Sequence, residues 1–119
     1  MNPSDSNSNT WLLACLCAAW CSACGEYRNT FDALAREREG SARFIWVDIE
    51  DNEQALGSID VVDFPTLLIA HGDNIVFFGP VTPYLQTARQ LLLRAQRGQL
   101  DMRYDPGLAG LAARISSLG

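Results

Sequence analysis

Residues 11–19 (WLLACLCAA) are apolar at every position, and this run constrains the fold more than any other stretch of the sequence. A strand that is exposed on one face alternates apolar and polar residues, whereas a strand buried on both faces does not. A sheet with such a central strand needs helices on both of its faces. The run therefore predicts an α/β protein.

A helical pattern follows this strand almost at once. Across residues 22–39, Tyr27, Phe31 and Leu34 recur at helical spacing, and Gly40 is a suitable end. Residues 43–49 (RFIWVDI) then predict a second buried strand, and residues 51–59 a short helix. The first half of the chain therefore alternates strand and helix.

The second half begins with two short apolar runs, residues 66–70 and 75–78, separated by the turn residues HGDN. This pattern predicts an antiparallel hairpin. Thr82 and Pro83 then suit the N-cap and first position of a helix that runs to about Arg97. The expected order is β-α-β-α-β-β-α. Right-handed crossovers would make the first three strands parallel and place the fourth antiparallel at an edge.

The chain of 119 residues is the length of one domain. We expect residues 1–10, which are polar, to be disordered, and residues 11–98 to form the folded domain. Residues 99–119 form a C-terminal extension. In it Leu108, Leu111, Ile115 and Leu118 indicate a short amphipathic helix that packs on the domain or on a partner.

Charge and targeting signals narrow the classes of function. The net charge of −5 argues against a nucleic-acid partner, because there is no basic excess to neutralise phosphates. The apolar run at residues 11–20 is too short to span a bilayer. A signal peptide carries basic residues before its apolar segment, and the ten residues before this run contain no Lys or Arg. We therefore expect a cytoplasmic protein, monomeric and without a membrane partner.

All four cysteines, Cys15, Cys17, Cys21 and Cys24, lie within ten residues. A structural disulfide framework distributes its cysteines along the chain. Here no cysteine follows Cys24, so disulfides could not cross-link most of the fold. The spacing C-x-C-x3-C-x2-C offers enough soft ligands for zinc or an iron–sulfur cluster. However, two of the four belong to a strand interior and two to a helix start. We expect no metal and no cofactor, with a four-cysteine metal site as an alternative.

Cys21 and Cys24 occupy the point at which the buried strand gives way to the helix. Two thiols at this spacing can form a disulfide, and the free N–H groups and positive dipole end of the helix stabilise a thiolate. Cys21 is then the better nucleophile and Cys24 the resolving thiol. Cys15 and Cys17 are expected to be buried core thiols, since neighbours at i and i+2 in a strand are not positioned to bridge.

The chain resembles the thioredoxin family over residues 11–97. The matching parts are Trp20-Cys21-Ser22-Ala23-Cys24, Val47-Asp48-Ile49 and Phe64-Pro65-Thr66. The resemblance implies a thioredoxin-like fold, a four-stranded mixed sheet with helices on both faces. It also implies a cis Pro65 beside the CxxC, substrate pairing with the backbone at Phe64, and a groove that Gly79 and Trp20 help to line.

Two departures from the family pattern stand out. Cys15 occupies the position at which thioredoxins commonly carry a buried carboxylate, and Asp48 is the candidate to replace that carboxylate. In the family a βα unit precedes the strand that corresponds to residues 11–19, and this unit is also missing.

The resulting expectation is a thiol–disulfide oxidoreductase of the protein-disulfide reductase type that acts in cell redox homeostasis. Cys21 and Cys24 form its redox-active disulfide, and Trp20, Phe64, Pro65 and Gly79 bind substrate. Its partners are protein disulfides and an unidentified electron donor. The alternative besides a metal site is a redox-silent binding module that docks partners at the groove around Pro65.

Overall fold

The computed structural model describes residues 11–57, 59–100 and 106–118 of the chain. The expected disorder of residues 1–10 lies outside them. The strands are β1 (Trp11–Cys17), β2 (Arg43–Asp48), β3 (Thr66–His71) and β4 (Asn74–Pro80). The helices are α2 (Ser22–Glu37), α3 (Glu53–Leu56), α4 (Leu85–Gln96), the 3-10 turn η1 (Pro106–Leu108) and α5 (Leu111–Ser116).

The four strands form one mixed sheet in the order β2-β1-β3-β4. β1 pairs in parallel with β2, β3 runs antiparallel to β1, and β4 antiparallel to β3. The expectation that β3 is parallel to β1 was wrong. A parallel crossover must carry the chain back along the whole strand, and α3 has a single turn of four residues. The chain instead turns back at the end where β2 finishes.

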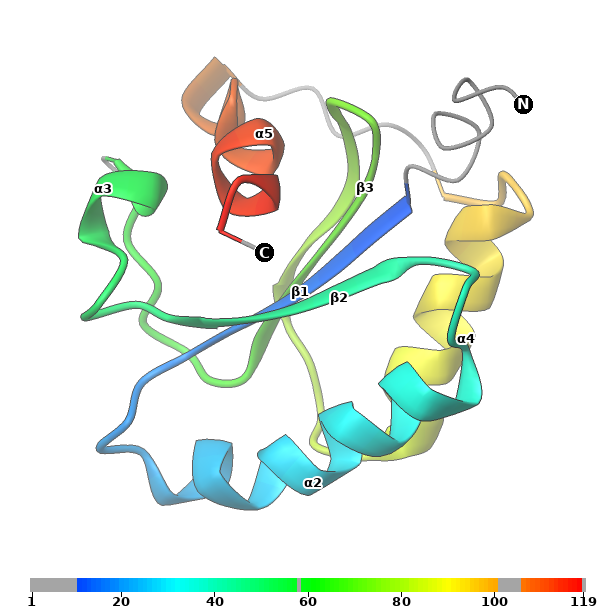
Figure 1. Ribbon diagram of the computed structural model, residues 1–119, viewed down its shortest axis with the longest axis horizontal. Helices are drawn as coiled ribbons and strands as arrows, with labels where there is room; N and C mark the ends of the chain where they lie inside the picture. The colour runs from blue at the N-terminus through cyan, green and yellow to red at the C-terminus, as the bar shows by residue number, and fades with distance from the viewer. Residues whose placement is uncertain (1–10, 58, 101–105, 119) are drawn as a thin grey trace.

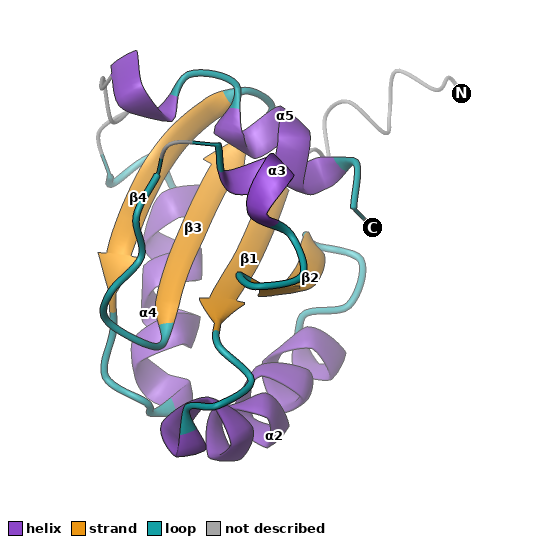
Figure 2. Ribbon diagram, turned by 90° about the vertical axis from the view of Figure 1, so that its left-hand side faces the viewer, coloured by secondary structure: helices purple, strands orange, loops and turns teal. Residues whose placement is uncertain are grey.

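The two faces of β1 contribute to two separate cores, as its continuous apolar run requires. Cys15 and Cys17 lie on the face covered by α2 and α4, together with Leu13. Leu12, Ala14 and Leu16 alternate with them and lie on the face covered by α3, η1 and α5. Figures 1 and 2 show these two helix layers on opposite sides of the sheet. The expected four-stranded mixed sheet with helices on both faces is confirmed.

The short C-terminal helix α5 packs against the sheet. Its inward residues Leu111 and Ile115 are fully buried, in the same core as Leu56 of α3. The Arg114 Nε–H donates to the Ala55 carbonyl at 2.7 Å, which ties α5 to the end of α3. Of the two packing alternatives for this helix, the domain itself is the one observed (Figure 1).

Two helix starts differ from expectation by one or two residues. The N-cap of α4 is Tyr84, in an extended conformation, and not Thr82. The Thr82 hydroxyl instead bonds the Thr87 hydroxyl at 2.6 Å, and the helix begins at Leu85. The short helix expected at residues 51–59 is α3 (Glu53–Leu56), and its N-cap is Asn52.

α2 and α4 lie side by side on one face of the sheet and are joined at the surface. The Arg89 guanidinium donates to both carboxylate oxygens of Glu37, at 2.6 and 2.7 Å. This two-point contact lowers the pKa of the Glu37 carboxyl and raises that of Arg89. None of the helices in the described segments is both long enough and apolar enough to cross a membrane.

Candidate functional site

Cys21 is the N-cap of α2. β1 ends at Cys17, the chain turns, and the Cys21 N–H donates to the Ala18 carbonyl at 3.0 Å. The Cys21 carbonyl then accepts from the N–H groups of Cys24 and Gly25, at 3.1 and 3.2 Å, which starts the helix. Cys21 is half-buried and carries a free thiol. The expected position of this cysteine, at a helix start next to a buried strand, is the observed one.

Cys24 faces inward and is joined by a disulfide to Cys17. The structure therefore does not contain the expected Cys21–Cys24 bond, and Cys17 is not the free core thiol that the sequence suggested. Cys24 begins the buried stripe of α2 that continues with Tyr27, Phe31 and Leu34. Cys17 points to the same layer from the end of β1, with a Cα–Cα separation of 5.8 Å that suits a disulfide.

A signal for this pairing was present in the sequence. Cys17 shares a strand face with Leu13 and Cys15, by the two-residue period of a strand, and Cys24 leads the apolar stripe of the helix that covers this face. Sequence reasoning missed the pair because it treated the strand cysteines and the helix cysteines as separate groups. Only the packing of α2 on β1 brings the two together.

Cys15 is a free thiol inside the same layer. Its Sγ lies 3.8 Å from the Cys17 Sγ, and the residue has no exposed surface. Burial raises the pKa of the Cys15 thiol to about 12, opposed in part by the positive charge of Arg28. Burial and the neighbouring Cys15 also raise the pKa of Tyr27. Cys15 is thus the core thiol that the sequence predicts, and it does not bridge to Cys17.

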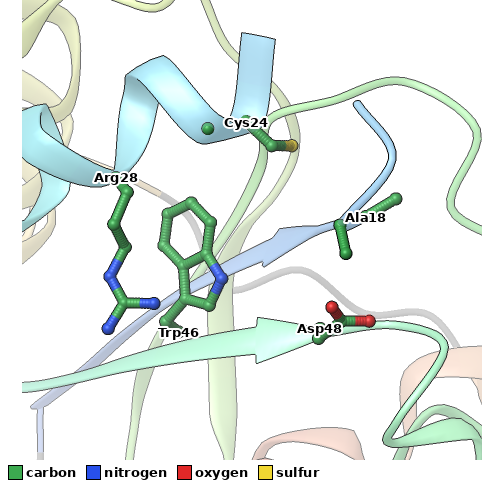
Figure 3. A pocket seen from close by; sticks show the side chains of 7 residues that line it. Ala18, Cys24, Arg28, Trp46 and Asp48 are labelled. Carbon is green, nitrogen blue, oxygen red and sulfur yellow. The ribbon is translucent and has the colours of Figure 1, made fainter. Parts of the chain in front are cut away.

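A pocket opens beside Cys24 at the end of β1, and Figure 3 shows its side chains. The Arg28 guanidinium lies over the Trp46 ring, 4.8 Å from its centroid, along one wall. The residues that line the pocket are Ala18, Ala19, Cys24, Gly25, Arg28, Trp46 and Asp48. The pocket therefore brings an aromatic ring, a cation and a carboxylate beside the buried cysteine.

Asp48 is the candidate for the carboxylate that Cys15 replaces. It is the parallel-strand register partner of Cys17 and lines the same pocket as Cys24. Its Oδ1 accepts from the backbone N–H groups of Glu50 and Asp51, at 2.9 and 3.4 Å, so one oxygen is committed to the turn after β2. Asp48 thus has a structural role and also a position beside the cysteines.

Trp20, Phe64 and Pro65 are brought together by the loops before α2 and before β3. The Phe64–Pro65 peptide bond is cis, as the resemblance implied. The Trp20 and Phe64 rings meet edge to face, with centroids 5.7 Å apart. Trp20 is 68% exposed, so an aromatic surface lies directly before Cys21. The Pro65 carbonyl accepts from the Val81 N–H at 3.1 Å, which fixes this loop to the end of β4.

Gly79 lies in β4, opposite Leu67 of β3. It lines a pocket whose other described residues are Asp60, Val61, Val62, Asp63, Thr66, Phe78 and Pro80. That lining includes neither Trp20 nor Phe64. The structure therefore groups three of the four expected substrate-binding residues and places Gly79 at a neighbouring pocket.

The described residues contain no group of three or more His, Cys, Asp or Glu side chains arranged to hold a metal ion. The disulfide also takes up two of the four cysteine sulfurs that the metal alternative required.

Comparison with known proteins identifies similar sequences. The family model described as Thioredoxin matches residues 5–82. Thioredoxin from Listeria monocytogenes is 29% identical over 59 residues, which cover 50% of this chain and 57% of the relative. Thioredoxin 2 from Chlorobaculum tepidum is 30% identical over 70 residues, which cover 59% of this chain and 64% of the relative. The chain thus spans less than two thirds of the length of these curated relatives.

Similar solved structures include the thioredoxin of Fasciola hepatica. It matches with a TM-score of 0.65 and 23% sequence identity, over 76% of this chain and 85% of that chain. At this level of identity the likeness shows the fold, a mixed sheet with helices on both faces.

Proposed function

Since the chain belongs to the thioredoxin family, we propose that it is a thiol–disulfide oxidoreductase of the protein-disulfide reductase type. Cys21 is the attacking thiol and Cys24 the resolving thiol. The observation that carries this proposal is the free, half-buried Cys21 at the N-cap of α2, next to the cis Phe64–Pro65 loop.

The position of Cys21 suits a nucleophile. The first N–H groups of a helix lack carbonyl partners within the helix, and the dipole of α2, a helix of 16 residues, is positive at this end. Negatively charged groups are favoured at such a helix end, and the sulfur that attacks a disulfide carries a negative charge. Cys21 is also accessible, whereas Cys15, Cys17 and Cys24 are almost completely buried.

The loops around Cys21 suit an extended peptide as substrate. The exposed ring of Trp20 and the partly buried ring of Phe64 form an aromatic corner beside the thiol. Within the described residues, neither the N–H nor the C=O of Phe64 makes a backbone hydrogen bond. A substrate segment can therefore pair with this backbone as an added strand. The hydrogen bond from the Val81 N–H to the Pro65 carbonyl holds the loop against β4. Gly79, which lines the neighbouring pocket on the β4 side, is proposed to extend this groove as a small residue.

The reaction needs both cysteines of the CxxC motif. The Cys21 thiolate attacks one sulfur of the substrate disulfide, forms a mixed disulfide and releases the second substrate sulfur as a thiolate. The Cys24 thiolate then attacks the Cys21 sulfur and releases the first substrate thiol, which leaves a Cys21–Cys24 disulfide. An electron donor returns this disulfide to two thiols. Cys24 can take part only when its bond to Cys17 is open.

The proposal extends to the cellular role. Protein disulfides are the substrate class, the electron donor is unidentified, and redox homeostasis in the cytoplasm is the process. The four cysteines lie within ten residues, two in β1 and two at the start of α2, and this grouping supports a catalytic use over a disulfide framework. We propose that the protein acts as a monomer.

The test is the reduction of insulin by dithiothreitol, followed by precipitation of the free insulin chain. The wild type should accelerate precipitation, and Cys21→Ser should reduce the rate to that of dithiothreitol alone. Cys15→Ala is the matched control, because it also removes one thiol but leaves Cys21 and Cys24 in place. A wild-type protein without activity would contradict the proposal and favour the redox-silent binding module.

A further inference from the structure

Cys24 lies within reach of two different cysteines. Its disulfide partner in the structure is Cys17, on β1. Cys21 lies three residues before Cys24, at the spacing at which two thiols at a helix start can bond, and packs against the same apolar cluster as Cys15, Cys17 and Cys24. The Cys24 sulfur can form only one disulfide at a time. The two bonds therefore exclude each other.

The two cysteines that are bonded in the structure are closed to solvent. Cys17 is 1% exposed and Cys24 is 2% exposed. A thiol or disulfide from solution must align with the sulfur that it attacks, so neither sulfur can be attacked directly in the folded protein. Cys21 is half-buried and is the most accessible of the four cysteines, all of which the structure describes. It is therefore the entry point for oxidising and reducing agents.

We propose that Cys17 is a third redox cysteine, which takes over the disulfide of Cys24 from Cys21 and leaves Cys21 as a free thiol. This inference rests on the proposed function, in which a Cys21–Cys24 disulfide forms on turnover. The Cys17 thiolate attacks the Cys24 sulfur, the Cys17–Cys24 bond forms, and the Cys21–Cys24 bond breaks. Cys21 leaves as a thiolate and takes up the proton that Cys17 lost. No net oxidation or reduction occurs.

The surroundings of Cys17 suit this exchange. The Cys15 sulfur lies 3.8 Å away and carries a proton, so its S–H can donate to an anionic Cys17 sulfur. The Arg28 guanidinium lines the pocket beside Cys24, where a positive charge favours negative charge on nearby sulfurs. The carboxylate of Asp48, opposite Cys17 in the strand register, offers a proton acceptor at the edge of the same pocket.

The exchange has a consequence for turnover. While Cys24 is bonded to Cys17, Cys21 can capture a substrate as a mixed disulfide, but Cys24 cannot release it. The bond opens again only when the Cys21 thiolate attacks the Cys24 sulfur in the reverse direction. The Cys17–Cys24 disulfide therefore leaves Cys21 as the reactive thiol of the site. Attack by Cys21 on Cys24 restores the Cys21–Cys24 disulfide.

The test starts from fully reduced, folded protein and adds glutathione disulfide. Free thiols are alkylated in acid-quenched, denatured samples. Chymotrypsin cleaves after Trp20 and Tyr27, so a Cys17–Cys24 bond joins two peptides, whereas a Cys21–Cys24 bond stays within one. The wild type should give the joined peptides with alkyl groups on both free cysteines, Cys21 and Cys15. Cys17→Ala should give only the internal Cys21–Cys24 bond. Cys15→Ala should reach the same joined peptides as the wild type but more slowly, because it lacks the S–H that donates to Cys17.

The Cys21→Ser variant tests whether the Cys17–Cys24 disulfide forms by exchange through Cys21 or forms directly as a structural disulfide. If the oxidising agent enters through Cys21, this variant should form the Cys17–Cys24 bond roughly tenfold more slowly than the wild type, or not at all. Formation at the wild-type rate would overturn the proposal, because Cys17 and Cys24 would then pair without Cys21. A wild type that shows only the internal bond would overturn it too, and neither result depends on whether Cys17→Ala folds.

The two proposals fail in different assays. Insulin reduction with only the internal bond present overturns the exchange and leaves the oxidoreductase intact. Joined peptides that depend on Cys21, without insulin reduction, overturn the proposed reductase activity and leave the exchange intact.

Discussion

The Trp20 ring meets the Phe64 ring edge to face, 5.7 Å from centroid to centroid, and so connects the loop before Cys21 to the cis-proline loop. These loops are separated by more than forty residues in the sequence. The contact is at the surface, because Trp20 is 68% exposed. It therefore contributes more to the shape of the proposed groove than to the stability of the fold.

Trp20→Ala should raise the KM for insulin by roughly two- to tenfold, because the substrate segment would lose its contact with the exposed Trp20 ring and an aromatic contact contributes about 0.5–1.5 kcal/mol. Reduction of a small disulfide that does not span the groove should change little. Steady-state kinetics with both substrates measure the difference. Leu118→Ala, which removes another exposed apolar side chain, is the control. An equal loss of activity with insulin and with the small disulfide would show that Trp20 affects the exchange reaction and not the binding of the protein substrate.

Native alkylation should distinguish the two free cysteines. Cys21 is half-buried, whereas Cys15 has no exposed surface and a pKa of about 12. Iodoacetamide should therefore add one group to the folded, oxidised protein and a second only after unfolding. Mass spectrometry counts the groups, and Cys21→Ser should lose the first one. Two groups on the folded protein would show that the layer between β1 and α2 opens.

The Cys15 thiol should make the protein less stable at alkaline pH. Its pKa is raised from 9.0 to about 12, so the folded state keeps a proton that the unfolded chain loses. The stability from this group is complete below pH 9.0 and is lost as the pH rises towards 12, at up to about 1.4 kcal/mol per pH unit. Urea unfolding between pH 8 and 11 measures the slope. Cys15→Ala should have a shallower slope, and an unchanged slope would contradict the assignment.

Leu111→Ala should destabilise the protein by about 2–5 kcal/mol, because the residue is fully buried in the core under β1 and β2. Urea unfolding of the wild type and the variant measures the difference. Leu118→Ala is again the matched control, since Leu118 is 42% exposed, and should change stability by no more than about 0.5 kcal/mol. Equal effects would mean that α5 does not belong to the core in solution.

The Glu37 carboxyl should titrate below its ordinary pKa of 4.5, because Arg89 donates two hydrogen bonds to the charged form. The stability from this pair should be present above pH 4.5 and lost as the pH falls through the lowered pKa. NMR titration of the side chain measures the pKa directly. Arg89→Gln should return it towards 4.5, and high salt should move it in the same direction. No change in Arg89→Gln would contradict the contact.

Three features were predictable from the sequence: the element order, the burial of β1 on both faces and the place of the CxxC motif at a helix start. The family resemblance also predicted the cis Pro65. These features depend on local periodicity and on residues close together in the chain. The direction of β3 depended on how far one turn of α3 can carry the chain, which a periodic pattern does not report. The packing of α5 on the sheet depended on which apolar face was left uncovered.

The disulfide partner of Cys24 was likewise decided by tertiary structure. In the sequence Cys21 and Cys17 are both near Cys24, and the motif favours Cys21. When α2 packs on β1, the inward stripe of the helix meets the inward face of the strand, and this contact places the Cys24 sulfur against the Cys17 sulfur. A disulfide requires two sulfurs at bonding distance, and that distance is set by the packing of helix on strand as well as by spacing along the chain.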